Sequence, residues 1–123
     1  MKAGDVISLV DREEPNGFDA QTKLMWINDL DNRVFLSVVL THEHEAGLTR
    51  EPIDSIEDEL LIPAPYATDC YITYLRAKIA AANLEAVRYN QHMTMFNSSY
   101  QEFVNYYNRE HMPLSKRGNR FKF

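Results

Sequence analysis

Apolar residues recur at helical spacing near the start of the chain. They fall at i, i+3, i+4 and i+7 and so share one face of a short helix over residues 2–14: Ala3, Val6, Ile7 and Val10. The turn-forming residues Pro15, Asn16 and Gly17 follow and predict the end of this helix.

A second apolar stripe predicts a longer helix over residues 20–41. Asp19 is expected to cap it by accepting free backbone amides, and Phe18 to pack as a hydrophobic staple against Lys23 or Leu24. The inner stripe, widened by Trp26 and Phe35, is Ile27, Leu30, Val34, Val38 and Thr41. The polar face is Asn28, Asp29, Asp31, Asn32 and Arg33. Residues 35–40 are rich in β-branched side chains and could form a strand, but the unbroken period favours helix.

The helical period is lost over residues 42–65, which contain Gly47, Pro52, Pro63, Pro65 and many acids. Proline favours extended backbone in the residue before it. We therefore expect an extended connector that wraps over the helices. Residues 60–62 (Leu-Leu-Ile) are its expected anchor in the core and could form one short strand.

Residues 68–108 predict a helical hairpin. Thr68 or Asp69 caps its first helix, and the break falls near Asn83. The stripe of the first helix is Ile72, Leu75, Ile79 and Ala82. The second helix begins near Leu84 or Glu85, and its stripe alternates spacings of four and three: Tyr89, Met93, Phe96, Tyr100, Phe103 and Tyr107. Pro113 should end this helix near His111.

The last ten residues, 114–123, lack a helical period, and four of them are basic. This tail could be a disordered end, could contact DNA phosphates weakly, or could add as a strand to a partner's sheet edge. Phe121 and Phe123 alternate with cations, which favours the third interpretation.

Length and composition fit one mostly α domain, a small bundle of about four helices over residues 1–113 followed by the tail. The 123 residues carry a net charge of −5, which argues against a protein that grips nucleic-acid phosphates but not against one that surrounds DNA. The single cysteine, Cys70, excludes an intrachain disulfide and is expected to be structural. The first residues lack the apolar run of a signal peptide, and no apolar stretch is long enough to span a bilayer. We expect a protein that is used inside a cell or packed into a particle assembled there.

Candidate chemical sites are weak. His42 and His44 lie two apart, whereas helical zinc motifs place histidines four apart, so a metal-dependent hydrolase is a minor alternative. The carboxylates of Asp29 and Asp31 and those within residues 54–59 look solvated. We expect no cofactor, no metal and no catalytic residue. Apolar residues of the connector and amphipathic tyrosines favour the edge of a core or a subunit interface, and the interface candidates are Ile53, Ile56, Leu61, Tyr66, Tyr74 and Tyr106.

Three stretches resemble a known family. They are residues 6–31, with Trp26; residues 59–66 (Glu-Leu-Leu-Ile-Pro-Ala-Pro-Tyr); and residues 81–113, with Arg88-Tyr89-Asn90, Met95-Phe96-Asn97 and the closing Tyr107 to Pro113 run. Together they resemble the head–tail connector, or adaptor, proteins of tailed bacteriophages and of prophages of Gram-positive bacteria. Members of that family often have glycine in the turn between the last helices, where this chain has Leu84.

The resemblance implies a structural virion protein, assembled in the bacterial cytoplasm, that forms a ring of usually twelve copies beneath the portal protein. DNA would pass through the ring without specific binding, and a further neck or tail-completion protein would follow. The C-terminal extension would engage the portal, which corresponds here to Leu114, Lys116, Arg117, Arg120, Phe121, Lys122 and Phe123. The connector over residues 47–65 would contact a neighbouring subunit or the next neck protein. The alternative is a small regulatory or nucleic-acid-binding helical protein.

Overall fold

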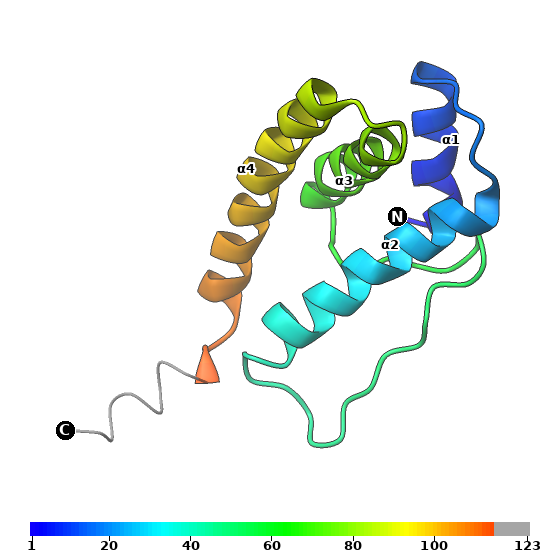
Figure 1. The fold of residues 1–123 in the computed structure, drawn as a ribbon. Helices are drawn as coiled ribbons and strands as arrows, with labels where there is room; N and C mark the ends of the chain where they lie inside the picture. Colours follow the sequence, from blue (N-terminus) through cyan, green and yellow to red (C-terminus); the bar gives the residue numbers. More distant parts are fainter. Residues whose placement is uncertain (115–123) are drawn as a thin grey trace.

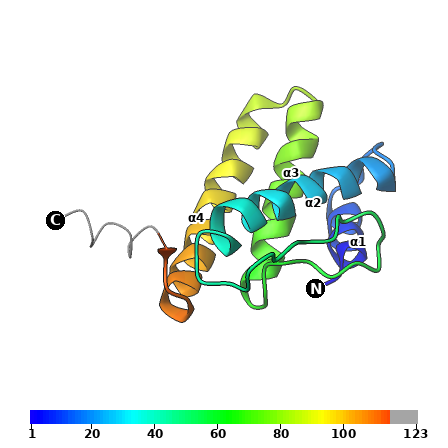
Figure 2. The ribbon, with the colours of Figure 1, turned by 90° about the horizontal axis from the view of Figure 1, so that it is seen from below.

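The computed structural model describes residues 1–114 and shows four α-helices and one π-helical segment. These are α1 (Ala3–Glu13), α2 (Ala20–Val34), η1 (Phe35–Val39), α3 (Tyr66–Ala82) and α4 (Ala86–Glu110). Helix α3 is central: α4 runs antiparallel beside it, α1 packs on it, and α2 crosses it (Figure 1). The connector loops back along α2 towards α1, as the second view shows (Figure 2). The mostly α fold with a long C-terminal hairpin is confirmed.

Helix α1 buries the predicted face and is capped by the connector. Its four predicted apolar residues are all buried. The backbone amides of Ala3 and Gly4, which have no partner within the helix, donate to the carbonyls of Asp58 (2.9 Å) and Ile56 (2.8 Å). A Cβ on Gly4 would lie 2.9 Å from the Ile56 carbonyl oxygen, so only glycine allows this approach. The start of α1 and the end of the connector therefore hold each other in place.

Helix α2 begins as predicted, because the Asp19 carboxylate accepts the amide of Thr22 at 2.8 Å. Phe18 packs edge-to-face on Trp26, with ring centroids 5.3 Å apart, and lies against the core cluster that includes Leu24. Residues 35–40 are helical rather than a strand, but they form a π turn in which the Leu40 amide donates to the Phe35 carbonyl. Thr41 is exposed and lies outside the inner stripe, so that assignment is wrong; its hydroxyl instead donates to the Ser37 carbonyl at 2.8 Å.

The hairpin begins two residues earlier than predicted. Helix α3 starts at Tyr66, where the amides of Tyr66 and Ala67 both donate to the Pro63 carbonyl, so neither Thr68 nor Asp69 is the cap. Chain reversal occurs at Asn83 and Leu84, and Leu84 has a left-handed φ of 59°. Glycine is the residue that normally occupies such a turn. The break near Asn83 is confirmed.

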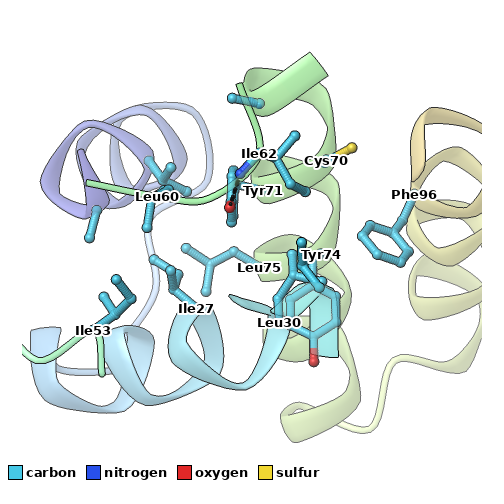
Figure 3. Packing of buried hydrophobic residues seen from close by; sticks show 14 of the residues in the cluster. Ile27, Leu30, Ile53, Leu60, Ile62, Cys70, Tyr71, Tyr74, Leu75 and Phe96 are labelled. Carbon is cyan, nitrogen blue, oxygen red and sulfur yellow. Dashed lines mark hydrogen bonds between the residues drawn. The ribbon is translucent and has the colours of Figure 1, made fainter. Parts of the chain in front are cut away.

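The core is one continuous cluster contributed by all four α-helices, η1 and the connector. Figure 3 shows Ile27 and Leu30 of α2, Leu60 and Ile62 of the connector, and side chains of α3 meeting around Tyr71. The connector anchor is confirmed in part: Leu60 and Ile62 are buried, whereas Leu61 is 39% exposed. No strand longer than a single-residue bridge occurs in residues 1–114, and the bridge next to the anchor joins Lys2 to Glu59.

Candidate interaction surfaces

A buried carboxylate on α2 fixes the connector. The prediction that Asp31 lies on a solvated face is wrong, because its side chain is fully buried. It accepts the Tyr71 hydroxyl of α3 and, at 3.0 Å, the backbone amide of Leu61. Tyr71 in turn accepts the amide of Ile62 at 3.0 Å, the contact drawn in Figure 3. Burial raises the pKa of Asp31 and also the pKa of Tyr71. Two successive connector amides are thus held by one buried polar pair.

A second polar side chain of α2 holds the connector one turn earlier. Asn28 accepts the backbone amide of Ile53 at 2.8 Å and the guanidinium of Arg50. Arg50 also reaches Asn32, at 3.5 Å. The side-chain oxygen of Asn28 therefore accepts a backbone amide that, in an extended segment, would otherwise need a partner in a neighbouring strand.

Connector residues within 48–53 and 59–61, together with α2 and η1, line a partly open recess of about 250 Å³. We call it the connector recess. Its wall is mostly apolar, with carboxylates and one guanidinium among the residues that line it: Asp31, Phe35, Val39, Leu48, Thr49, Arg50, Glu51, Ile53, Glu59 and Leu61. Such a site fits an apolar side chain that has a cation beside it.

A short backbone pairing joins residues 112–114, which follow α4, to residues 41–43 at the start of the connector. The Leu114 amide donates to the Thr41 carbonyl at 2.8 Å, and the Glu43 amide donates to the Met112 carbonyl at 3.0 Å. His42 is buried in this corner, with Nδ1 2.6 Å from the Val38 carbonyl and Nε2 2.6 Å from Asn108 Oδ1. Its ring also packs edge-to-face on Tyr107. We call this corner the exit clamp, and it places Leu114 next to the residues that follow η1.

The predicted interface residues divide into three groups. Ile53 and Tyr74 are buried within the subunit, at 7% and 9% exposed, so they are not available to a partner in this conformation. Tyr66 and Tyr106 are half-buried and pack on each other across α3 and α4, with centroids 5.1 Å apart. Ile56 and Leu61 are exposed on the connector, at 50% and 39%.

The predicted hairpin stripe is correct in its centre and wrong at its tip. Leu75 and Ile79 of α3 pack with Phe96 and Phe103 of α4 as fully buried side chains. The partly buried members of the stripe are Ile72, Met93, Tyr100 and Tyr107. Tyr89, near the tip, is 36% exposed and is not part of the buried core.

The hairpin tip instead presents an apolar surface. Leu84 is 91% exposed and Val87 70% exposed, and Leu84 and Tyr89 line a shallow pocket of about 280 Å³. We call these three exposed side chains at the tip, of which only Leu84 and Tyr89 share the pocket, the tip patch. A second exposed apolar pair, Met112 and Leu114, lies at the other end of α4.

The weak chemical candidates have structural explanations in the described residues. The two ring nitrogens of His42 are engaged within the exit clamp, and the Nδ1 of His44 lies 2.7 Å from the His42 carbonyl. Within residues 1–114 no three His, Cys, Asp or Glu side chains are placed to hold a metal ion. Cys70 is fully buried, and burial raises the pKa of its thiol to about 12, so it is not a reactive thiolate. No helix of that part of the chain is long and apolar enough to cross a bilayer.

Charge is divided unequally between the body and the tail. All 18 acidic residues and nine of the 13 basic residues lie in residues 1–114, a net charge of −9. The other four basic residues lie in the tail: Lys116, Arg117, Arg120 and Lys122. These four, with Phe121 and Phe123, lie outside the described residues, so of the predicted portal-binding set only Leu114 is placed.

The sequence interpretation missed the connector recess and the role of Asp31. Asp31 follows the buried Leu30 directly and lies four residues after Ile27, so it borders the apolar stripe, and that position was the available signal.

Comparison with protein-family models, with curated proteins and with solved structures found no match for this chain.

Proposed function

We propose that this chain is a structural subunit of a bacteriophage neck, which forms a ring, docks on the portal protein and joins head to tail around the DNA channel. The proposal rests on the resemblance of residues 6–31, 59–66 and 81–113 to head–tail connector proteins. The mostly helical fold with a long helical hairpin is the layout that this resemblance implies.

The observation that carries the proposal is the pair of unlike apolar surfaces at opposite ends of α4. The tip patch lies at one end, and Met112 and Leu114 lie at the other. Exposed apolar patches on small proteins commonly mark interaction sites. Two different patches suit head-to-tail association, which closes into a ring when the rotation between subunits allows it.

The charge of the body supports a channel through which DNA slides. A body with a net charge of −9 repels phosphates and so offers no grip that would slow genome passage. We assign the cationic tail to the portal, as the resemblance to head–tail connector proteins implies.

Substitutions at the tip patch test ring formation. In the full chain, Leu84→Ser with Val87→Ser should abolish assembly into rings on portal particles, as seen by electron microscopy. Both side chains are exposed, so the fold should be retained. The matched control is Asn97→Ser with Gln101→Ser, two exposed positions one turn apart on α4, which should assemble normally. Normal rings from the tip variant would contradict the proposed interface, and no binding of the wild-type chain to portal particles would contradict the neck function.

A small nucleic-acid-binding protein is the second candidate, favoured by the four cations within the tail. It requires a shift of duplex DNA by the full chain at low salt that weakens steeply as salt rises. Four phosphate contacts would give a slope of about −3.6 in log affinity against log salt. Absence of any shift at low salt would eliminate this candidate.

A further inference from the structure

We propose that the connector recess is a docking site for the chain's own C-terminal tail, residues 115–123. The tail would place Phe121 or Phe123 in the recess and its neighbouring cations against the acidic rim. This assignment concerns the isolated subunit and is separate from the contact of the tail with a portal.

The recess has the chemistry that the tail requires. Phe35, Val39 and Leu61 supply apolar wall, and Leu61 is left 39% exposed although it lies between two buried residues. Two solvent-accessible carboxylates line the same space, from Glu51 and Glu59, while the third lining acid, Asp31, is buried and already engaged by Tyr71 and Leu61. Arg50 is the one cation of the lining, and its guanidinium is already engaged by Asn28. An occupant with aromatic rings flanked by cations fits this lining better than an anionic or purely apolar one.

The tail alternates the same two features in its last residues, Arg120-Phe121-Lys122-Phe123. Its four cations face no acid within the tail, because residues 115–123 contain none. The connector over residues 43–59 holds seven acids and one base: Glu43, Glu45, Glu51, Asp54, Glu57, Asp58 and Glu59, with Arg50. Charge complementarity therefore favours the connector over other surfaces of the body.

The exit clamp delivers the tail to the recess. Leu114 is bonded to Thr41, and Thr41 lies two residues beyond Val39, which lines the recess. Nine further residues reach at most about 30 Å when extended. A segment of this length, tethered so close to its site, has an effective concentration on the order of millimolar, so even a weak contact is populated.

Docking in the isolated subunit would cover one of the two phenylalanines until a competing partner binds the tail. This consequence rests on the proposed function: the portal would be that competitor, and ring formation would then follow tail release. The docking itself does not depend on the identity of the competitor.

Cysteine crosslinking in the full chain tests the proposal. Cys70 is fully buried and has a pKa raised to about 12, so introduced cysteines are the reactive ones. We expect Thr49→Cys with Asn119→Cys to be joined by a short bismaleimide within one chain, giving a monomer band of altered mobility. The matched control is Asn105→Cys with Asn119→Cys, because Asn105 is exposed on α4 and nine residues before Leu114, but does not line the recess.

The recess pair should react about tenfold faster than the control pair, and adding Phe121→Ser and Phe123→Ser should remove the difference. Equal rates for the two pairs would overturn the proposal. Crosslinked dimers that increase with protein concentration would also overturn it, by assigning the recess to the tail of a second copy. Crosslinking within one chain, together with no binding to portal particles, would retain the docking and remove the neck function.

Discussion

The hairpin and the connector are both ordered, but by different physical means. In the hairpin, α3 and α4 bury aromatic and aliphatic side chains against each other over many turns, among them Phe96 and Phe103. The connector has no helix and pairs with other segments only through single-residue bridges within residues 1–114. It is held at a few points, by polar groups on α2 and α3, by the start of α1 and by the buried side chains of Ile53, Leu60 and Ile62. Packing that is spread over many residues tolerates small changes, whereas a segment held at a few points is lost when one of them is removed.

The two regions also differ in what they offer to a partner: the hairpin forms the scaffold, and the connector forms exposed surface. The central side chains of the hairpin stripe lie between α3 and α4 and are not available to a partner. The connector, by contrast, leaves Ile56 and Leu61 exposed and lines the recess. Loops positioned on a rigid scaffold are where binding sites are commonly found. Breaking each region separately should therefore give different outcomes.

The largest effect is expected from the hairpin. Phe96→Ala removes a ring that is fully buried between Tyr74 and Tyr100, and should lower the free energy of unfolding by about 3–5 kcal/mol. Because the stripe joins both helices to the core, the loss should be global and seen as one transition by urea denaturation with circular dichroism. Phe96→Leu, which keeps much of the volume, should cost clearly less. Equal costs for the two variants would show that the cavity does not determine the loss.

Asp31→Ala should cost about 3 kcal/mol, because it leaves the Tyr71 hydroxyl and the Leu61 amide without their acceptor. In contrast to Phe96→Ala, the loss should begin locally. Hydrogen exchange of residues 60–62 should rise before that of α4. Uniform acceleration across the molecule would contradict the view that the connector is held at separate points.

The pH dependence of stability gives a second measurement at Asp31. Burial raises its pKa in the folded protein above the ordinary value of 3.8, so the folded state binds the proton more tightly than the unfolded state. The stability that this group contributes is then greatest below pH 3.8 and falls as pH rises through the folded pKa. Asp31→Asn does not titrate, so wild type should lose stability relative to this variant between about pH 4 and the folded pKa. A wild type that gains on the variant over that window would contradict the raised pKa.

The comparison also explains what could be predicted from the sequence. The stripes of α1, α2 and the hairpin repeat at helical spacing, so the helices and most of their buried faces follow from periodicity alone. The connector has no period, and its path depends on contacts between residues far apart in sequence, such as Asp31 with Leu61. A polar residue beside an apolar stripe looks solvated until its distant partner is known. For that reason the helical scaffold was predictable, and the buried Asp31 and the recess were not.

Asn28→Ala should have a smaller effect, about 1–2 kcal/mol, because the Ile53 amide loses its acceptor at the edge of the core. The matched control is Asn32→Ala, one turn later on α2, which contacts the same Arg50 only at 3.5 Å and is exposed. The control should stay within about 0.5 kcal/mol of wild type. Faster hydrogen exchange at residue 53 in the first variant alone would locate the anchor, and similar changes in both would assign the effect to Arg50 instead.

The smallest effect should have the opposite sign. Leu84 is the one non-glycine residue with a positive φ in residues 1–114, and a left-handed backbone costs a leucine about 1–2 kcal/mol. Leu84→Gly removes that strain but adds flexibility to the unfolded chain, which offsets about 0.5–1 kcal/mol. We therefore expect a net gain of about 0.5–1 kcal/mol, the difference of those terms, measured by urea denaturation. Leu84→Ala keeps the strain and should show no gain. Because Leu84 is 91% exposed, packing within the subunit does not explain a leucine here. A glycine variant that is more stable but assembles less well on portal particles would show that the chain retains a strained residue for the contact made by the tip patch.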